Sequence, residues 1–245
     1  MESSVLITVI RRRLLMALLT LGLVFGSLLW LPARIIEPLL PPSAECGVLK
    51  GTVWRGQCDD LRIRGSRSGS IAWALGLSIQ RPLTFPVRLR WTKDSSVAEG
   101  TLQAALFEPT SLELESVSIE LESLRNALPA DVFLGPLAGV DGQIDASGLR
   151  LQFDTGRLSA LHGEATLTRA TLLKSGAHFG PIFGRFDGRS GTVRDRGGPL
   201  EFNASVVLVA PGAFTAQVRV LPRVAGVLPG LPAGIPIEAD VEGRL

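Results

Sequence analysis

The sequence carries little net charge and few of the side chains from which catalytic and metal sites are commonly built. Its 25 Lys and Arg residues nearly balance its 23 Asp and Glu residues, which leaves a formal charge of +2. Histidine occurs only at His162 and His178, and neither has an adjacent serine, cysteine or paired carboxylate. A field strong enough to recruit nucleic acid is therefore not expected, and a nucleophile paired with a base is not predicted.

Acidic pairs and glycine-rich stretches also lack a catalytic pattern. Asp59-Asp60, Asp141 and Asp145 stand among strand and turn signals, where exposed aspartates are common. Residues 180–191, GPIFGRFDGRSG, lack the Gly-x-x-x-x-Gly-Lys-Ser/Thr pattern of a phosphate-binding loop, so we expect them to form turns. The sequence therefore predicts no enzyme active site, no cofactor and no metal site.

A long uncharged run near the N-terminus is the strongest local signal. Residues 14–31, LLMALLTLGLVFGSLLWL, contain no charge, and as a helix they would span about 27 Å, close to the hydrocarbon thickness of a bilayer. Three consecutive arginines at residues 11–13 precede the run, whereas only Arg34 follows it closely. The positive-inside rule therefore predicts a cytoplasmic N-terminus over residues 1–13 and export of everything after the helix.

A cleaved signal peptide is the alternative interpretation of this run. Its apolar region would be shorter, about 7 to 15 residues, and would end at a small-x-small cleavage site. The residues after Trp30, Leu31-Pro32-Ala33-Arg34, offer no Ala-x-Ala pattern, and Trp30 stands where an interfacial aromatic residue would lie. We therefore expect an uncleaved, single-pass anchor in the inner membrane, with the domain that follows in the periplasm.

The two cysteines, Cys46 and Cys58, both fall in the part that we expect to be exported to an oxidising compartment. A disulfide between them is the default expectation and would contribute about 3 kcal/mol by restricting the unfolded chain. Two free thiols are the alternative. A metal site would need further ligands, and both histidines are remote in sequence.

Between the anchor and the first strand, residues 32–47 read PARIIEPLLPPSAECG, in which four prolines disfavour a continued helix. We expect a short, stiff linker here, followed by a periplasmic β domain over residues 48–245. The 27 glycines and 16 prolines of the chain are in keeping with frequent turns.

Alternation with a period of two runs through this domain. In residues 71–79 large apolar side chains occupy every odd position, and in residues 87–91 apolar residues alternate with arginine. Prolines at 82 and 86 lie between the two runs, which predicts a β-hairpin. Similar alternation at residues 149–153, 214–220 and 237–241 predicts further strands, so the fold class is mainly β, a twisted or curved antiparallel sheet in one or two lobes.

The alternation changes phase within residues 112–122. Apolar residues lie at even positions up to Leu114 but at odd positions from Val117 onward. Since a one-residue slip would turn the core face outward, we expect a β-bulge at Glu115-Ser116 that keeps the four glutamates of this segment in solvent. Residues 124–137, LRNALPADVFLGPL, predict a loop or short helix and a possible boundary between two lobes.

The run from Val206 to Val209 is apolar at every position. Such a run is typical of a central strand that is buried on both sides, and this is the interpretation that we favour. The alternative is a strand that pairs with a partner protein by β-augmentation.

Four short motifs resemble one known family. In chain order they are Gly51-Thr52-Val53-Trp54-Arg55-Gly56, Ile71-Ala72-Trp73-Ala74-Leu75, Gly197-Gly198-Pro199-Leu200 and Leu221-Pro222-Arg223. With the Pro-rich segment and the anchor before them, they are similar to the general secretion pathway protein N family of type II secretion systems. The resemblance extends over nearly the whole chain and rests on the order of the motifs, because none is specific alone.

The resemblance implies a non-enzymatic, accessory subunit of the inner-membrane platform that faces the outer-membrane secretin and helps to move folded proteins out of the cell. It carries over no binding residues: we interpret Gly51, Thr52, Gly56, Gly198, Pro199, Pro222 and Arg223 as turn and core positions, and Trp54 and Trp73 as apolar anchors. The alternative is an anchored β-groove protein that binds or moves lipid, since alternation alone allows an apolar concave face.

Overall fold

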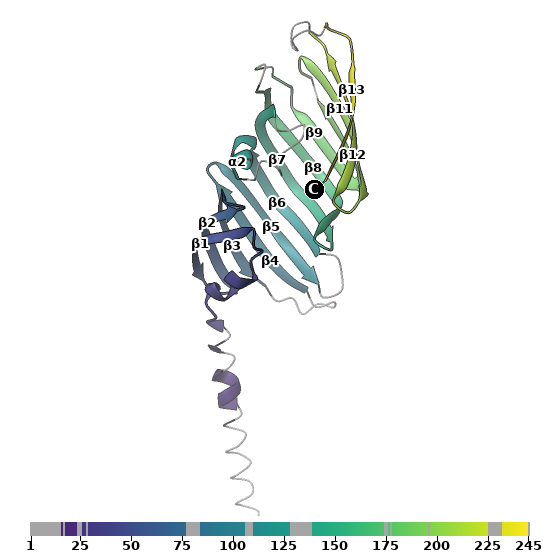
Figure 1. Ribbon diagram of the computed structural model, residues 1–245. Coiled ribbons are helices and arrows are strands. Elements are labelled where there is room, and N and C mark those ends of the chain that lie inside the picture. Colours follow the sequence, from purple (N-terminus) through teal and green to yellow (C-terminus); the bar gives the residue numbers. More distant parts are fainter. Residues whose placement is uncertain are drawn as a thin grey trace, which may run out of the picture.

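The computed structural model is a single curved sheet of 13 antiparallel strands, in which every strand pairs with its neighbours in sequence (Figure 1). It describes residues 16, 18–23, 26–27, 29–76, 84–105, 110–127, 139–173, 176, 178–195, 197–224 and 232–244. The strands are β1 (Ala44–Gly51), β2 (Arg55–Ile63), β3 (Ser66–Leu75), β4 (Thr84–Lys93), β5 (Ser96–Ala105), β6 (Thr110–Glu120), β7 (Val140–Asp154), β8 (Arg157–Leu172), β9 (Ile182–Gly188), β10 (Ser190–Asp195), β11 (Leu200–Ala210), β12 (Ala213–Pro222) and β13 (Ile237–Arg244). The mainly β fold class that the sequence predicts is thus confirmed.

Alternation divides the sheet into two faces of different chemistry. On β3 and β4 the pairs Ile71 with Trp91, Trp73 with Leu89 and Leu75 with Val87 are in register, which confirms the predicted hairpin and defines an apolar face. The opposite, outer face carries charged side chains that pair across neighbouring strands. These ion pairs are Arg90–Glu99, Arg150–Glu113, Arg185–Glu164 and Arg219–Glu238.

The predicted bulge in β6 is present. Glu99 of β5 lies opposite Ser116, but its neighbour Gly100 lies opposite Leu114, so that Glu115 is the extra residue. The bulge lets Leu114 and Val117 share the apolar face although one is at an even position and the other at an odd one. Glu115 and Ser116 are both exposed.

A short helix, α2 (Leu121–Ala127), covers the apolar face where the sheet curves (Figure 1). Ser68 Oγ of β3 donates to Ala127 O at 2.6 Å, and Arg125 Nη2 donates to Val140 O of β7 at 2.7 Å. In a flat sheet β3 and β7 would be about 19 Å apart, whereas a seven-residue helix is only about 10 Å long. The sheet must therefore curl around α2, whose first and last residues, Leu121 and Ala127, are buried.

A short 3-10 helix, η1 (Ala33–Leu39), occupies the segment that the sequence predicts as a linker, and β1 begins at Ala44. It packs on β1, with Ala33 only 1% exposed. Val53 N donates to Leu31 O at 3.0 Å, and Pro32 forms an isolated bridge with Thr52. The segment is thus attached to the sheet and does not act as a free linker.

The predicted anchor over residues 14–31 lies partly outside the described residues, as do residues 1–13. In the portion of the chain that the structure describes, no helix is long and apolar enough to cross a membrane.

The structure also tests three further predictions from the sequence. The prediction of turns over residues 180–191 is wrong, because they contain all of β9 and the first two residues of β10. Val206 to Val209 belong to β11, which is central as favoured, but Val207 and Val209 are 45% and 53% exposed, so the strand is not buried on both sides. β6 pairs directly with β7, so the sheet continues past the expected lobe boundary, and residues 128–138 lie outside the described residues.

Candidate functional site

The first group of motif residues forms a turn that holds the start of the domain together. Gly51 has a φ of 87°, which favours glycine, and Thr52 N donates to Arg55 O at 2.9 Å to close the β1–β2 turn. Trp73 Nε1 donates to Val53 O at 3.0 Å. A Cβ at Gly56 would lie 2.3 Å from Trp73 Cζ2, so the indole ring lies directly on this glycine.

Trp54 completes the same group. Its carbonyl accepts a hydrogen bond from Leu75 N at 2.7 Å, and its side chain is 38% exposed. Because Val53 also bonds to Leu31, this turn joins β3 to the segment that follows the predicted anchor. The arrangement is a structural clamp.

The second group lies near the other end of the sheet, where β10, β11 and β12 meet. Leu200 pairs with Pro222, and both are almost fully buried. Arg223 N donates to Pro199 O at 2.8 Å, while Arg223 Nη1 donates to Gly198 O at 3.1 Å.

Arg223 also neutralises a buried acid. Its Nη1 lies 3.3 Å from Asp195 Oδ2, and the Asp195 side chain is 1% exposed. Asp195 accepts further hydrogen bonds from the backbone N–H groups of Phe202 and Gly197. The two motif groups are therefore separate structural elements on β1–β3 and β10–β12, and the described residues do not bring them into one site.

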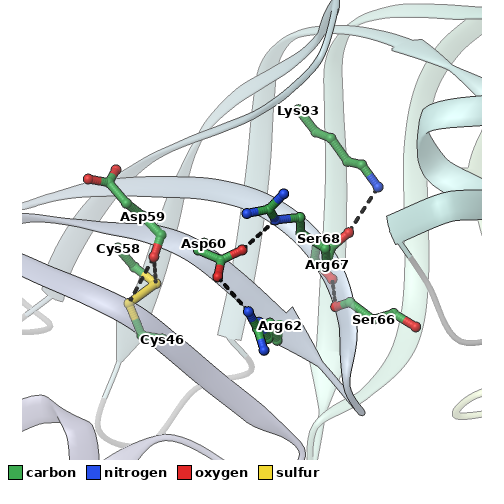
Figure 2. A network of polar contacts seen from close by, with 9 residues as sticks. All are labelled: Cys46, Cys58, Asp59, Asp60, Arg62, Ser66, Arg67, Ser68 and Lys93. Atoms are coloured by element: carbon green, nitrogen blue, oxygen red, sulfur yellow. Dashed lines mark hydrogen bonds and ion pairs between the residues drawn. A yellow bond between two sulfur atoms is a disulfide. The ribbon is translucent and has the colours of Figure 1, made fainter.

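Cys46 and Cys58 are joined by a disulfide that links β1 to β2, with a Cα–Cα distance of 5.8 Å (Figure 2). The neighbouring acids turn away from each other. Asp59 accepts hydrogen bonds from Lys50 at 2.7 Å and Gln57 at 2.5 Å, and these bonds lower its pKa, that from Lys50 most.

Asp60 has a φ of 58° and stands where the register between β2 and β3 shifts. Its carboxylate accepts from Arg67 Nε at 2.6 Å and Arg62 Nη2 at 2.9 Å, and these bonds lower its pKa, that from Arg67 most (Figure 2). An acid held ionised by two guanidinium groups is a poor proton donor at neutral pH. Asp59 and Asp60 therefore act as structural ion-pair partners.

The remaining polar candidates are also held in structural contacts. His162 Nδ1 accepts from Gly188 N at 3.2 Å, and His178 Nδ1 lies 3.0 Å from Thr171 Oγ1. Asp145 bonds to Ser118 at 2.9 Å, and Asp141 stands opposite Thr171 in the β7–β8 ladder. Among the described residues, no three His, Cys, Asp or Glu side chains are grouped so that they could hold a metal ion.

A hollow with an apolar lining lies on the apolar face between β7 and β13. Its volume is about 350 Å³. It is lined by Val140, Ile144, Ala165, Thr166, Leu167, Phe179, Ile182, Gly184, Phe186, Val193, Phe202, Ala204, Val206, Phe214, Ala216, Val218 and Val241. Because Thr166 stands between Ala165 and Leu167 on β8, its side chain points to the outer face. The remaining lining side chains are aliphatic or aromatic, apart from one glycine.

Reasoning from the sequence allowed an apolar concave face as an alternative but did not locate this cavity or its lining residues. The separate strands show alternation, but the cavity arises because the sheet curls until β8 approaches β11 across two intervening strands. One sequence signal was available: aromatic residues stand opposite glycines in neighbouring strands. Phe186 pairs with Gly191 on one side and Gly163 on the other, and Phe214 pairs with Gly243.

Comparison with known proteins gives one match. A family model described as type II secretion system protein N matches residues 44–226, about three quarters of the chain. No curated protein and no solved structure matches the chain significantly. The matched segment begins with β1, ends just after β12 and includes both groups of motif residues. The chain therefore belongs to the type II secretion system protein N family.

Proposed function

We propose that the chain is a non-enzymatic subunit of the inner-membrane platform of a type II secretion system, which supports export of folded proteins by contacts with other platform proteins and the outer-membrane secretin. The observation that carries the proposal is the family match, which covers the sheet from β1 to β12. Membership of this family implies a role in type II secretion; the subunit's position and contacts are our proposal.

A single N-terminal helix that anchors the domain from the cytoplasm to the periplasm is part of this proposal. The uncharged run at residues 14–31 and the arginines before it support that topology. Leu18, Leu21 and Trp30 are more than half exposed, as side chains that face lipid would be. Because Leu31 bonds to Val53, the β1–β3 end of the sheet would stand close to the membrane surface.

The edge of β13 is the surface that we propose for protein contacts. β13 pairs with β12 on one side, and no strand among the described residues pairs with its other side. A partner strand could therefore add to it by β-augmentation. Glu238, Asp240 and Glu242 are exposed on the outer face of β13, so a partner strand that alternates basic and apolar residues would complement both faces.

Crosslinking in cells tests this function. A photoreactive amino acid would replace Asp240 on β13, and a matched one would replace Glu164, which is exposed on the outer face of the central strand β8. We expect irradiation to join the Asp240 variant to secretin or platform proteins, and the Glu164 variant to do so far less. Captured proteins would be identified by mass spectrometry.

Charge reversal provides a second arm. Replacing Glu238 and Glu242 by lysine should weaken capture from Asp240, because the added cations would repel a basic partner strand. Capture that is equal from Asp240 and Glu164 would refute β13 as the contact edge. Absence of every secretion component from both would refute the platform role itself.

A second candidate function is binding or movement of lipid in the periplasm. It is favoured by one specific observation, the cavity on the apolar face, whose lining offers no polar side chain. A cavity of this kind is unexpected in a subunit that works by surface contacts alone.

A further inference from the structure

We propose that the cavity between β7 and β13 binds one acyl chain of a lipid. The inference specifies the ligand of the second candidate function and does not depend on the secretion contacts, which occur at β13 and on the outer face. It rests on the chemistry of the lining, on the dimensions of the cavity and on the way the fold keeps the cavity hollow.

The chemistry of the lining favours a hydrocarbon. Four of the ten phenylalanines of the chain, Phe179, Phe186, Phe202 and Phe214, line the cavity together with valine, isoleucine, leucine and alanine. Ligand sites for polar molecules carry a few well-placed donors or acceptors that fix orientation. None of the side chains that face this cavity is such a group, so the buried part of the ligand should need no hydrogen bond.

The volume of the cavity is small for a whole protein helix. One turn of an α-helix with its side chains fills a cylinder of roughly 400 Å³, which already exceeds the cavity volume of about 350 Å³. Along β11 the lining runs from Phe202 to Val206, and along β12 from Phe214 to Val218. Each stretch is about 13 Å long, which is enough for an extended segment of an acyl chain.

An extended peptide is excluded by hydrogen bonding. It would bring N–H and C=O groups into the cavity, and each such group costs free energy when it is buried without a partner. Among the described residues, the lining strands β7 to β12 each pair on both sides. An extended peptide could therefore pair only at the outer edge of β13, where it would lengthen the wall and not fill the cavity. An acyl chain has no such groups.

Glycines keep the cavity from being filled by its own aromatic rings. A Cβ at Gly191 would lie 2.4 Å from Phe186 Cδ1, and a Cβ at Gly243 would lie 2.5 Å from Phe214 Cε1. Both rings therefore lie flat on the backbone of the neighbouring strand. With a larger residue at Gly191 or Gly243, the ring would have to lift off the sheet into the hollow.

Beyond Phe186 and Phe214, at the tip of the short β9–β10 hairpin, two hydrogen bonds join the neighbouring segments of the sheet. Gly212 N of the β11–β12 turn donates to Leu158 O of β8 at 2.8 Å. Arg189, at the tip of the β9–β10 hairpin, donates through Nε to Leu208 O at 2.9 Å. We expect the acyl chain to enter from the end that is marked by Val140 and Phe179, away from these hydrogen bonds.

Photolabelling in cells tests the proposal on the full chain. Cells would be fed a fatty acid that carries a diazirine and a terminal alkyne and is incorporated into phospholipids. After irradiation, the chain would be isolated and the labelled residues mapped by mass spectrometry. We expect labels on cavity residues of β9, β11 and β12. Treatment of the adduct with phospholipase distinguishes a phospholipid from a free fatty acid, and either carrier supports the proposal.

Two adjacent residues of β11 provide a matched pair of variants. Ala204→Phe fills the cavity, whereas Ser205→Phe adds the same side chain to the exposed outer face. We expect Ala204→Phe to lower cavity labelling by about tenfold, because overpacking removes the room for the chain, and Ser205→Phe to leave it unchanged. If Ala204→Phe does not accumulate in cells, Ala216→Leu and its exposed neighbour Gln217→Leu give the same comparison on β12.

Either of two results would overturn the proposal. Labels confined to residues 14–31 or to the outer face would show that the cavity is not the site, as would equal labelling of the two variants in either pair. Capture of secretion proteins from β13 is measured separately. If the cavity is not labelled but secretion proteins are still captured from β13, only the acyl-chain site is refuted. If the cavity is labelled but no secretion protein is captured, only the platform role is refuted.

Discussion

The contact between Trp73 and Gly56 makes Gly56→Ala a sharp test of the clamp at the start of the domain. The added Cβ would lie 2.3 Å from Trp73 Cζ2, 2.8 Å from Cε2 and 2.9 Å from Lys50 O. The Lys50 carbonyl belongs to the backbone of the paired strand β1, so the indole ring must move. Its hydrogen bond to Val53 O, 3.0 Å long, would then be strained or lost.

The magnitude follows from three contributions. Overpacking costs about 1–3 kcal/mol, and loss of the Trp73 hydrogen bond about 1 kcal/mol. Replacement of glycine by alanine also restricts the unfolded chain, and this effect offsets about 0.4–1 kcal/mol of the destabilisation. We therefore expect a net loss of about 2 kcal/mol in the free energy of unfolding, which lowers the Tm by about 4–8 °C for a domain of this size.

Thermal unfolding of the full chain in detergent, followed by far-ultraviolet circular dichroism at one scan rate, measures this shift. Gly139→Ala is the control, because a Cβ there meets nothing within 4 Å. Gly56→Ala combined with Trp73→Phe should be less destabilised than the sum of the single variants, since the crowded indole atoms are absent. A Tm equal to that of Gly139→Ala, or additive single variants, would refute the reasoning.

Three further predictions concern links between strands. Replacing Cys46 and Cys58 by alanine should lower the free energy of unfolding by about 3 kcal/mol, and in cells both thiols should resist alkylation until a reductant is added; immediate alkylation would show that they are free. Arg223→Ala should cost about 1–3 kcal/mol, because the carboxylate of Asp195 is 1% exposed and would lose a hydrogen-bond donor; an unchanged Tm would contradict this. The pKa of Asp60 is lowered in the folded chain, so its contribution is present above its ordinary value of 3.8 and is lost as the pH falls through the folded pKa. As the pH falls below about 4, Asp60→Asn should therefore lose less free energy of unfolding than the wild type, as measured by urea unfolding. From pH 5 to 7 the free energy of unfolding should change with pH by nearly the same amount in both proteins.

Periodicity was sufficient to predict the strands whose two faces differ in chemistry. The pairs of β3 with β4 follow from bulky residues at Ile71 and Trp73 and from arginines between apolar residues in β4. The bulge at Glu115 follows from the change of phase, because only an extra residue keeps Leu114 and Val117 on one face. In each case the information is local, within one strand and its sequence neighbour.

Periodicity did not predict strands in which glycine stands at a position where a larger side chain would have shown the alternation. Residues 180–191 resemble turns because of their glycines, yet Gly184 and Gly191 are strand positions on which the ring of Phe186 lies. The cavity could not be predicted for a related reason. Alternation shows which side chains share a face, but the curvature that brings β8 toward β11 depends on contacts between distant strands.

The two candidate functions use different surfaces of one sheet, and β13 connects them. Val241 lines the cavity, while its neighbours Asp240 and Glu242 are exposed on the outer face. A partner strand added to β13 would therefore extend the wall of the cavity as well as cover the acidic edge. Since β13 pairs with β12 alone among the described strands, its order should be low when the cavity is empty and higher when an acyl chain packs against Val241. We therefore expect the acyl chain and the partner strand to favour each other's binding, because each would stabilise the same edge strand.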